Sequence, residues 1–336
     1  MKIANFDLNK DILLVAEIGN NHEGSYALAE EMIGLAAQAG AEAVKFQTFI
    51  PEKLVSLLQK ERIEQLKRFQ LTYDEFEKLS NVAKKENVLF LSTPFDIESA
   101  KFLEPLVPAY KISSGDNNFY PLIEVIAKTG KPIIMSTGLI EFEEVKSSVD
   151  FINNIWKENG IEQDLAVLHC VTSYPTPPDQ ANLLSIKQLQ NLNVTVGYSD
   201  HTLGIQAAIL AVALGARIIE KHFTIDKNYS DFRDHQLSAD PKELKLLVEK
   251  IKITQELLGQ NKKEIQVSEK DNLLALRRSI VAKRNLVKNE IISKEDITWT
   301  RPGGGIPPGQ ESLVIGKKIK QDIKKGEKIL SEMITK

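Results

Sequence analysis

Short apolar runs, many of them rich in β-branched residues, recur along the first 225 residues, and each ends in polar or small residues. Between most of them lie longer stretches whose apolar residues recur every three or four positions, the period of an amphipathic helix. The short runs predict strands at residues 13–17, 43–47, 88–92, 109–113, 132–136, 166–169, 194–198 and 217–221. The longer stretches predict helices at residues 27–39, 73–85, 120–129, 142–155, 203–214 and 241–257.

Eight strands that alternate with helices predict an α/β fold, the (β/α)8 or TIM barrel. Small polar residues follow the predicted strands, at residues 19–23, 93–96, 114–117, 137–138 and 172–175. In such barrels these segments open onto one face, which holds the active site. An open, doubly wound sheet is the alternative, but no Gly-x-Gly-x-x-Gly motif follows the first strand to bind a dinucleotide.

The chain after the predicted barrel differs in pattern. The last barrel helix is expected to end near Gly259, and the residues that follow it are polar. We predict a barrel domain at residues 1–260, a linker at 261–278 and a small second domain at 279–336. An internal repeat, residues 286–293 and 323–331, predicts two turns flanked by short strands, and the glycine loop after Arg301 is expected to be flexible.

Charge also separates the two parts of the chain. Residues 263–336 hold 16 Lys and Arg against 10 Asp and Glu, a net +6, which leaves −9 for the rest of a chain whose net charge is −3. These basic residues form no long run and are not interleaved with aromatic residues, so we do not expect nucleic-acid binding. A solvated basic surface is the simpler interpretation.

The composition is that of a globular protein from a reducing compartment. The 336 residues are 42% hydrophobic and 26% charged, and the single cysteine excludes a disulfide framework. The first ten residues are polar and charged, and no apolar stretch reaches the roughly 18 residues that a membrane helix needs. We therefore expect a cytoplasmic protein without a membrane span.

Two histidines end neighbouring predicted strands. His201 follows the seventh strand and His222 the eighth, and the helix predicted between them makes the strand tips adjacent. Two imidazoles at adjacent tips favour a metal site over isolated structural histidines. With carboxylates such as Glu17, Glu220 and Asp234 nearby, the site suits Mn²⁺ or Mg²⁺ better than a closed structural zinc.

Lysines within apolar strand runs are the second chemical signal. Lys45, Lys111 and Lys221 are expected to be buried, and a buried ammonium needs an anion. That anion is either a protein carboxylate or the phosphate or carboxylate of a substrate, with hydroxyl groups supplied by Ser92, Thr93, Ser114 and Ser199. A Schiff base on Lys111, as in barrel aldolases, is an alternative.

Glu17 and Glu220 place carboxylates on the first and eighth strands, which close the ring side by side. They are candidates for acid/base chemistry, although a salt bridge to Lys45 or Lys221 is equally compatible with the sequence. His169 and Cys170 are consecutive, so they point to opposite faces of a strand and cannot act as a nucleophile and its base. We expect a buried, inert thiol.

Several of these motifs together resemble the sialic acid synthase family, whose members make nine-carbon nonulosonic acids. The similarity lies in residues 16–24, 44–48, 92–95, 111–115, 136–138, 168–170, 174–177, 197–201 and 220–224, in the order found in that family. The segment around Arg301 resembles the family's C-terminal antifreeze-like (SAF) domain. The resemblance covers nearly the whole chain.

This resemblance implies a metal-dependent condensation of phosphoenolpyruvate with the open-chain aldehyde of an N-acylated mannosamine-type sugar, which releases phosphate. N-acetylneuraminate is the first expected product, and N,N'-diacetyllegionaminate and pseudaminate are the alternatives. Asp116 stands where many family members have Glu, and residues 228–235 differ from the loop of many relatives. Both differences leave the acceptor open. A Schiff-base aldolase and a non-catalytic sugar-binding protein are the competing functions.

The resemblance also implies roles for individual residues. The metal would be held by His201 and His222, and the reacting carbons would be flanked by Glu17 and Glu220. The residues implied for phosphoenolpyruvate are Lys45, Thr93, Lys111, Ser114 and Ser199. The residues implied for the acceptor sugar are Gln47, Asp116, Tyr174 and Asp234. In a domain-swapped homodimer, Arg301 would reach the acceptor's N-acyl group in the site of the other subunit.

Overall fold

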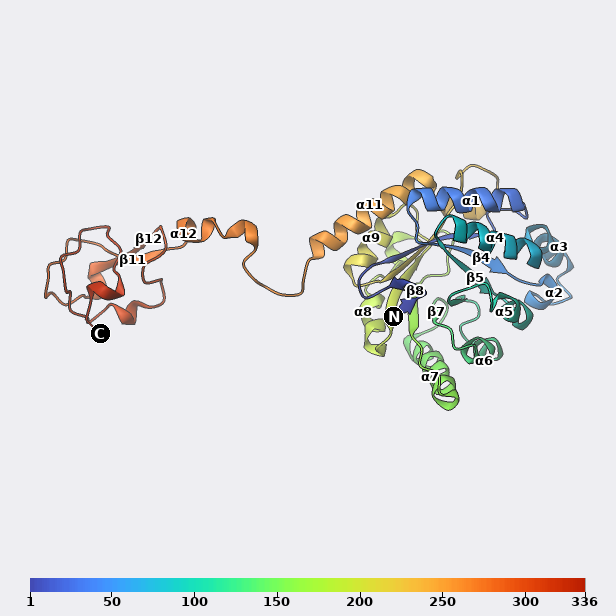
Figure 1. Cartoon of the computed structure of the whole chain (residues 1–336), viewed down its shortest axis with the longest axis horizontal. Helices are drawn as coiled ribbons and strands as arrows, with labels where there is room; N and C mark the ends of the chain where they lie inside the picture. The colour runs from blue at the N-terminus through green and yellow to red at the C-terminus, as the bar shows by residue number, and fades with distance from the viewer. Residues whose placement is uncertain (336) are drawn as a thin grey trace. The chain divides into compact units, whose positions relative to one another are not determined.

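The computed structural model describes residues 1–335. The chain forms two compact units, one from Met1 to Gly259 and one that begins at Gln260 (Figure 1). None of the described helices is both long and apolar enough to span a bilayer.

The first unit is built around eight parallel strands. They are β3 (Leu13–Gly19), β4 (Ala43–Thr48), β5 (Leu89–Pro94), β6 (Tyr110–Ile112), β7 (Ile133–Ser136), β8 (Leu165–Cys170), β9 (Thr195–Asp200) and β10 (Ile218–His222). Their order is β5-β4-β3-β10-β9-β8-β7-β6, and the outermost two, β5 and β6, also lie beside each other. The prediction of a TIM-type barrel is therefore confirmed, and all eight strands lie within two residues of their predicted ends.

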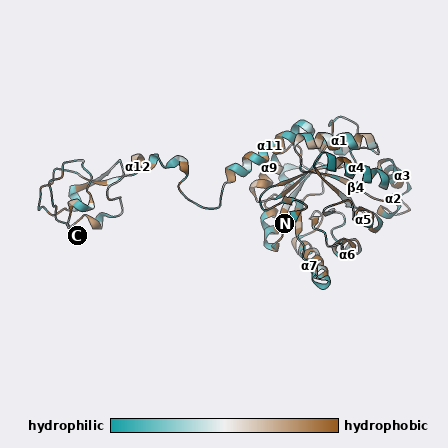
Figure 2. Ribbon diagram, viewed as in Figure 1, coloured by the Kyte–Doolittle hydropathy of each residue, from teal (hydrophilic) through white to brown (hydrophobic). Residues whose placement is uncertain are grey.

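Helices surround the strands of this unit (Figure 1). They are α1 (Tyr26–Ala39), α2 (Pro51–Leu54), α3 (Lys60–Phe69), α4 (Tyr73–Lys85), α5 (Ile97–Leu103), α6 (Tyr120–Lys128), α7 (Phe142–Asn159), α8 (Ser185–Leu189), α9 (Gln206–Ala213), α10 (Arg233–Leu237) and α11 (Pro241–Leu258). In Figure 2 the longer helices carry both hydrophobic and hydrophilic residues, in keeping with one buried and one exposed face. Helices α2, α3, α5, α8 and α10 were not predicted.

Local sequence explains where several helices begin. The capping box of Thr72 and Glu75 starts α4, and the Asp240 carboxylate accepts two backbone amides at the start of α11, where Pro241 occupies the first turn. Helix α1 ends at Gly40, which adopts the left-handed conformation (φ 95°) that glycine tolerates best.

Residues alternate between two cores along each barrel strand. Outward-facing residues such as Leu14 and Ile219 pack in one cluster with the helices. Inward-facing residues at the amino-terminal ends form a second cluster, which includes Leu13 and Ile218. An unpredicted hairpin, β1 (Lys2–Ile3) and β2 (Phe6–Asp7), covers this end and buries its own apolar residues there, namely Met1, Ile3 and Leu8. We call it the closed end of the barrel.

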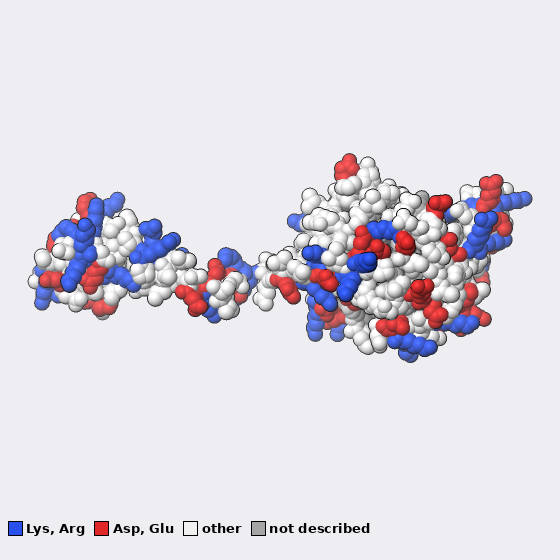
Figure 3. Space-filling model, turned by 90° about the horizontal axis from the view of Figure 1, so that it is seen from above, with Lys and Arg blue, Asp and Glu red and all other residues white. Residues whose placement is uncertain are grey.

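The second unit has a small core of its own. Strands β11 (Ser279–Ala282) and β12 (Ile297–Thr300) pair antiparallel, and buried isoleucines such as Ile280 and Ile292 form most of its cluster. Two short helical segments, η3 (Val267–Glu269) and α12 (Asn272–Leu276), lie within the predicted linker. Figure 3 shows acidic residues among the lysines and arginines of this unit.

The two copies of the repeat predicted in the second unit lie side by side. Leu286 and Ile323 exchange two backbone hydrogen bonds of 2.9 Å each, although the copies form isolated bridges and not the regular strands that we expected. The glycine loop after Arg301 is held more firmly than predicted: the Gly303 amide donates to the carbonyl of Leu274, and Lys328 Nζ donates to the carbonyl of Gly303, each at 2.7 Å.

Candidate active site

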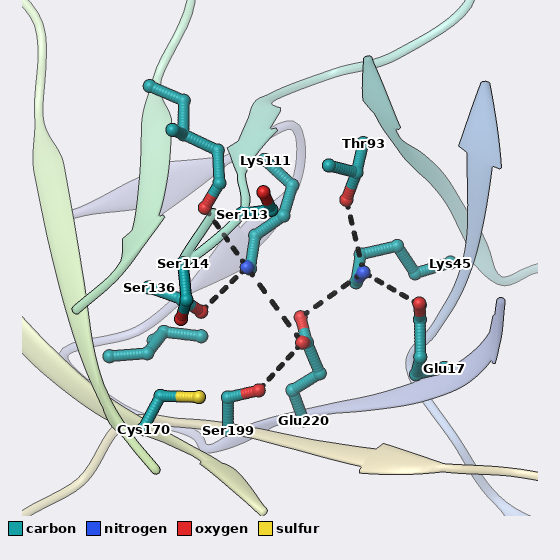
Figure 4. Close-up of polar contacts among 12 residues, drawn as sticks. Glu17, Lys45, Thr93, Lys111, Ser113, Ser114, Ser136, Cys170, Ser199 and Glu220 are labelled. Carbon is teal, nitrogen blue, oxygen red and sulfur yellow. Dashed lines mark hydrogen bonds and ion pairs between the residues drawn. The ribbon is translucent and has the colours of Figure 1, made fainter. Parts of the chain in front are cut away.

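A cavity of about 630 Å³ opens at the carboxyl ends of the barrel strands. Twelve residues predicted to form the site line it: Glu17, Lys45, Gln47, Thr93, Lys111, Ser114, Tyr174, Ser199, His201, Glu220, His222 and Asp234. Figure 4 shows how the charged groups at its floor converge from different strands. The strand alternation that gives the closed end its apolar core thus places polar side chains at this open end.

Lys45 of β4 lies between the two carboxylates. Its Nζ is 2.7 Å from Glu17 Oε2 and 3.7 Å from Glu220 Oε2, and it donates a hydrogen bond of 3.2 Å to Thr93 Oγ1. Burial alone would lower the pKa of Lys45, but the two carboxylates raise it above its usual value. The residue is only 3% exposed, so its positive charge is held within the floor.

Lys111 of β6 places a second ammonium in the floor. Its Nζ donates to Ser136 Oγ at 2.7 Å and to the carbonyl of Ile112 at 3.2 Å, and lies 3.8 Å from Glu220 Oε1. Burial lowers the pKa of Lys111, and Glu220 only partly opposes this effect. Lys111 therefore has a weaker protein counter-charge than Lys45 and more capacity to bind a further anion.

The two carboxyl groups differ in their affinity for protons. Burial raises the pKa of Glu17, against the opposing effect of Lys45. Burial would also raise the pKa of Glu220, but Lys111 and Lys45 hold it below its usual value, assisted by a 2.9 Å hydrogen bond from Ser199 Oγ. One carboxyl thus retains a proton more readily than the other, an arrangement suited to acid/base chemistry.

The two histidines are close neighbours in the same cavity. Their ring centroids are 5.4 Å apart, and the ring of Tyr174 lies 4.2 Å from that of His201. His201 Nδ1 is 2.8 Å from the carbonyl oxygen of Val171, so Nδ1 carries the hydrogen and Nε2 remains as the nitrogen that can bind a metal. This arrangement fits a metal-binding histidine.

The described residues supply only part of a metal shell. Within residues 1–335, no group of three or more His, Cys, Asp and Glu is arranged to hold an ion. A metal at His201 and His222 would therefore take other ligands from water or substrate, as a Mn²⁺ or Mg²⁺ site commonly does. The donor set is compatible with such an ion, and the metal assignment stays a prediction.

Comparison with known proteins identifies the family. The NeuB family matches residues 32–263, and the SAF domain matches residues 277–335. The chain belongs to the NeuB family. The resemblance to sialic acid synthases is thereby confirmed, together with the SAF domain at the carboxyl terminus, and the protein is a synthase of this family.

Its relatives within the NeuB family include proteins with different products. The chain is 38% identical to the N,N'-diacetyllegionaminic acid synthase of Campylobacter jejuni, across 95% of this chain and 99% of that protein. It is 45% identical to an uncharacterized protein of Methanocaldococcus jannaschii, across 92% and 90%. It also resembles the solved N-acetylneuraminic acid synthetase of Leptospira borgpetersenii (36% identity, TM-score 0.76), across 81% of this chain and 94% of that one.

Asp116, a predicted site residue of this NeuB-family chain, lies outside the cavity wall. Asp116 accepts a hydrogen bond of 2.5 Å from Ser113 Oγ, and Ser113, Ser114 and Gly115 line the cavity while Asp116 does not. Arg301 belongs to the second unit, so its role in acceptor binding stays a prediction.

Three further residues can be compared with their predictions. Lys221 faces away from the cavity, because it adjoins the inward-facing Glu220 on the strand. It pairs with Asp200 at 3.0 Å, so of the two anions considered for it, the partner is a protein carboxylate. Ser92 also faces outward and shares a 2.8 Å hydrogen bond with Thr48. Cys170 is buried as expected but lines the cavity, with Sγ 3.8 Å from His201 Nδ1, and the nearby His201, Ser114 and Lys111 outweigh the effect of burial and lower its pKa.

The structure adds an outer wall that sequence reasoning missed. Residues from α3 line the cavity, namely Arg62, Gln65, Leu66 and Phe69, and Phe232 joins them from the loop before α10. The rings of Phe69 and Phe232 pack with centroids 4.9 Å apart. The spacing of Ile63, Leu66 and Phe69 is helical, so the helix was recognisable, but nothing in that pattern showed which face meets the cavity.

Proposed function

We propose that this protein condenses phosphoenolpyruvate with an N-acylated mannosamine-type aldose, giving a nine-carbon nonulosonic acid and inorganic phosphate. One observation carries the proposal: two buried lysines, two carboxylates with opposite pKa shifts and two adjacent imidazoles share one cavity in a NeuB-family chain. The donor is a small trianion, and the floor offers two ammonium groups and several hydroxyl groups to bind it.

The donor would bind over the two lysines. Lys111 has the weaker protein counter-charge and lies next to the Ser136 hydroxyl, so it suits the phosphate or carboxylate of phosphoenolpyruvate. Ser114 and Ser199 line the same part of the floor (Figure 4), and Thr93 already contacts Lys45. Because these groups are buried, an anion bound there gains stronger electrostatic attraction than it would in water.

The reaction joins C3 of phosphoenolpyruvate to the aldehyde carbon of the sugar. The electron pair of the enol double bond forms the new C–C bond, and the aldehyde oxygen takes up a proton and becomes a hydroxyl group. Water then adds to the cationic C2, losing a proton, and cleavage of the C2–O bond releases phosphate. Glu17 and Glu220 are the groups that would supply and accept these protons.

A divalent cation at His201 and His222 would polarise the aldehyde oxygen as a Lewis acid. The chain's own contribution is to hold these rings in place: Val171 fixes the tautomer of His201, and Tyr174 packs against both rings, at 4.2 Å and 5.9 Å between centroids. Gln47 and Asp234, which also line the cavity, would bind hydroxyl groups of the acceptor.

The first acceptor to test is N-acetylmannosamine, which would make the protein an N-acetylneuraminate synthase. The outer wall favours a second candidate, a diacetamido-trideoxy sugar, which would give a legionaminate- or pseudaminate-type product. Phe69 and Phe232 place two aromatic rings on that wall, and an apolar surface favours a methyl terminus over a hydroxymethyl group. The 38% identity to a diacetyllegionaminic acid synthase supports this second acceptor.

Phosphate release from phosphoenolpyruvate tests the proposal directly. The assay would combine each acceptor with Mn²⁺, Mg²⁺ or EDTA, and we expect release only when both sugar and metal are present. Release at the same rate without sugar or in EDTA would refute the mechanism. Borohydride trapping with pyruvate addresses the competing aldolase, because a labelled Lys111 that survives chelation would replace this reaction by Schiff-base chemistry.

We also propose that a domain-swapped homodimer brings Arg301 to the acceptor's N-acyl group. The support is the family resemblance of the SAF domain and its basic charge beside a net acidic barrel sequence. Mixing an Arg301→Ala variant with a Glu17→Ala variant tests this arrangement. Partial recovery of activity in the mixture is expected if the two residues act in one site from different subunits.

A further inference from the structure

The loop that follows β3 contacts several segments that form the outer cavity. In this loop, residues 20–24, only Asn20 lines the cavity itself, and it donates a 3.0 Å hydrogen bond to Gln47 Oε1. Residues 21–24 do not line the cavity, so their role must be something other than direct contact with a substrate.

Asn21 ties this loop to the chain beyond β10. It is fully buried, and its Nδ2 donates to the carbonyl of Phe223 at 2.8 Å and to Ser238 Oγ at 2.9 Å. Ser238 in turn donates to the carbonyl of Asp234 at 2.5 Å. Asn21 thus holds both ends of residues 223–238, which we call the acceptor segment.

Glu23 holds the middle of the acceptor segment. One carboxylate oxygen, Oε1, accepts from Ser230 Oγ and lies 3.1 Å from His235 Nε2. His235 is completely buried, and its Nδ1 is 2.6 Å from Thr224 Oγ1. Because a carboxylate only accepts hydrogen bonds, Nε2 carries the hydrogen shared with Glu23.

Together, the contacts of Asn21 and Glu23 clamp the acceptor segment. Two side chains of this clamped segment face the cavity. Phe232 and Asp234 both line it, and both shortly precede the buried His235 in the chain. Phe232 also packs on Phe69 at the end of α3. That helix end rests on the same loop, because a Cβ on Gly24 would lie 2.0 Å from the carbonyl oxygen of Arg68.

We propose that Glu23 and His235 are positioning residues for the acceptor sugar. Through the Glu23–His235 and Glu23–Ser230 contacts they fix Asp234 and Phe232 at the outer cavity, while the two lysines that would bind the donor lie on β4 and β6. This inference rests on the proposed function, since it assigns the outer cavity to the acceptor and the floor to phosphoenolpyruvate.

The test is a comparison of the two Michaelis constants in Glu23→Ala. We expect the KM for the sugar to rise about tenfold, the effect of one lost charge-assisted contact, and the KM for phosphoenolpyruvate to stay within about twofold. Glu23→Gln should restore the sugar KM to within about threefold, because the amide oxygen can still accept both hydrogen bonds. Glu30→Ala, on the exposed face of α1, is the matched control.

Hydrogen exchange supplies a readout that does not depend on turnover. The backbone amides of His235 and Ser238 bond within the acceptor segment, and their exchange should accelerate in Glu23→Ala but not in Glu30→Ala. If Glu23→Ala does not fold, Ser230→Ala removes one contact and should raise the sugar KM by about threefold.

The outcomes distinguish a failure of the positioning role of Glu23 and His235 from a failure of the proposed synthase function. A wild-type protein that releases no phosphate with any acceptor refutes the proposed function. An active wild type whose Glu23→Ala variant keeps its sugar KM and exchange rates refutes the clamp alone. Equal increases in both Michaelis constants, or a Glu23→Gln variant as impaired as Glu23→Ala, would also refute an acceptor-specific role for Glu23.

Discussion

The two ends of the barrel are made by the same eight strands but differ completely in chemistry. Along β3 the inward-facing residues are Leu13, Val15 and Glu17, and along β10 they are Ile218, Glu220 and His222. The closed end is filled by aliphatic side chains and covered by the β1–β2 hairpin. The open end holds buried charges that are paired chiefly with one another.

This difference separates stability from function along each strand. Burial of aliphatic groups stabilises the closed end. Burial of charges at the open end costs hydration free energy, and only their ion-pair partners offset that cost. Substitutions at the closed end should therefore change the free energy of unfolding and leave the Michaelis constants unchanged. Substitutions at the open end should reduce activity first.

The largest effect is expected from Lys45→Met at the open end. The change removes the cation that lies between Glu17 and Glu220, so two buried carboxylates face each other. We expect kcat/KM for phosphoenolpyruvate to fall by about a thousandfold, or roughly 4 kcal/mol. Phosphate release measures it, and Lys53→Met on the exposed surface is the control. A loss below about tenfold would place the donor elsewhere.

An effect of similar size, on stability and not on activity, is expected where a buried pair faces away from the cavity. Lys221 and Asp200 are both fully buried, and Lys221→Met alone leaves the carboxylate without its partner. We expect the free energy of unfolding to fall by about 3–5 kcal/mol, and the double variant Asp200→Leu/Lys221→Met to recover much of that loss. Urea denaturation measures both. A double variant as unstable as the sum of the single variants would refute the pairing argument.

At the closed end, Leu8→Ala should act on stability alone. Leu8 is 1% exposed and packs within the inward-facing cluster, so its truncation should reduce the free energy of unfolding by about 2–4 kcal/mol. Both Michaelis constants should remain unchanged. Leu57→Ala, at an exposed position, is the control. A shift in either Michaelis constant would show that the two ends are coupled.

The smallest effect concerns Glu42, also near the closed end. Burial raises its pKa to about 7, so its stabilising contribution is complete below its unfolded value near 4.5 and is lost as the pH rises through about 7. Glu42→Gln should therefore be more stable than wild type by about 1–2 kcal/mol at pH 8, with no gain at pH 5. Thermal unfolding at the two pH values checks this, and a gain that does not depend on pH would contradict it.

The sequence predicted the barrel well because short apolar runs, many of them rich in β-branched residues, end in polar or small residues. It did not reveal the β1–β2 hairpin, since strands of two residues carry no periodicity. Strand alternation, which we used to place His169 and Cys170 on opposite faces, also predicts that Lys221 points away from the cavity. Its neighbour Glu220 was already assigned to the inside, so this orientation could have been predicted. Tertiary packing decides which face of α3 meets the cavity and where the Asp116 side chain lies. A local sequence pattern does not encode that packing.

The aromatic contact between Phe69 and Phe232 joins two segments that lie outside the eight strands. Substrate range could therefore be redesigned by exchanging these two segments as a matched pair between homologous enzymes, with the catalytic strands left intact. Such a chimera would need a glycine at position 24, since any side chain there would collide with the incoming helix. Gly24 is therefore the residue to retain when these segments are exchanged to obtain new nine-carbon sugars.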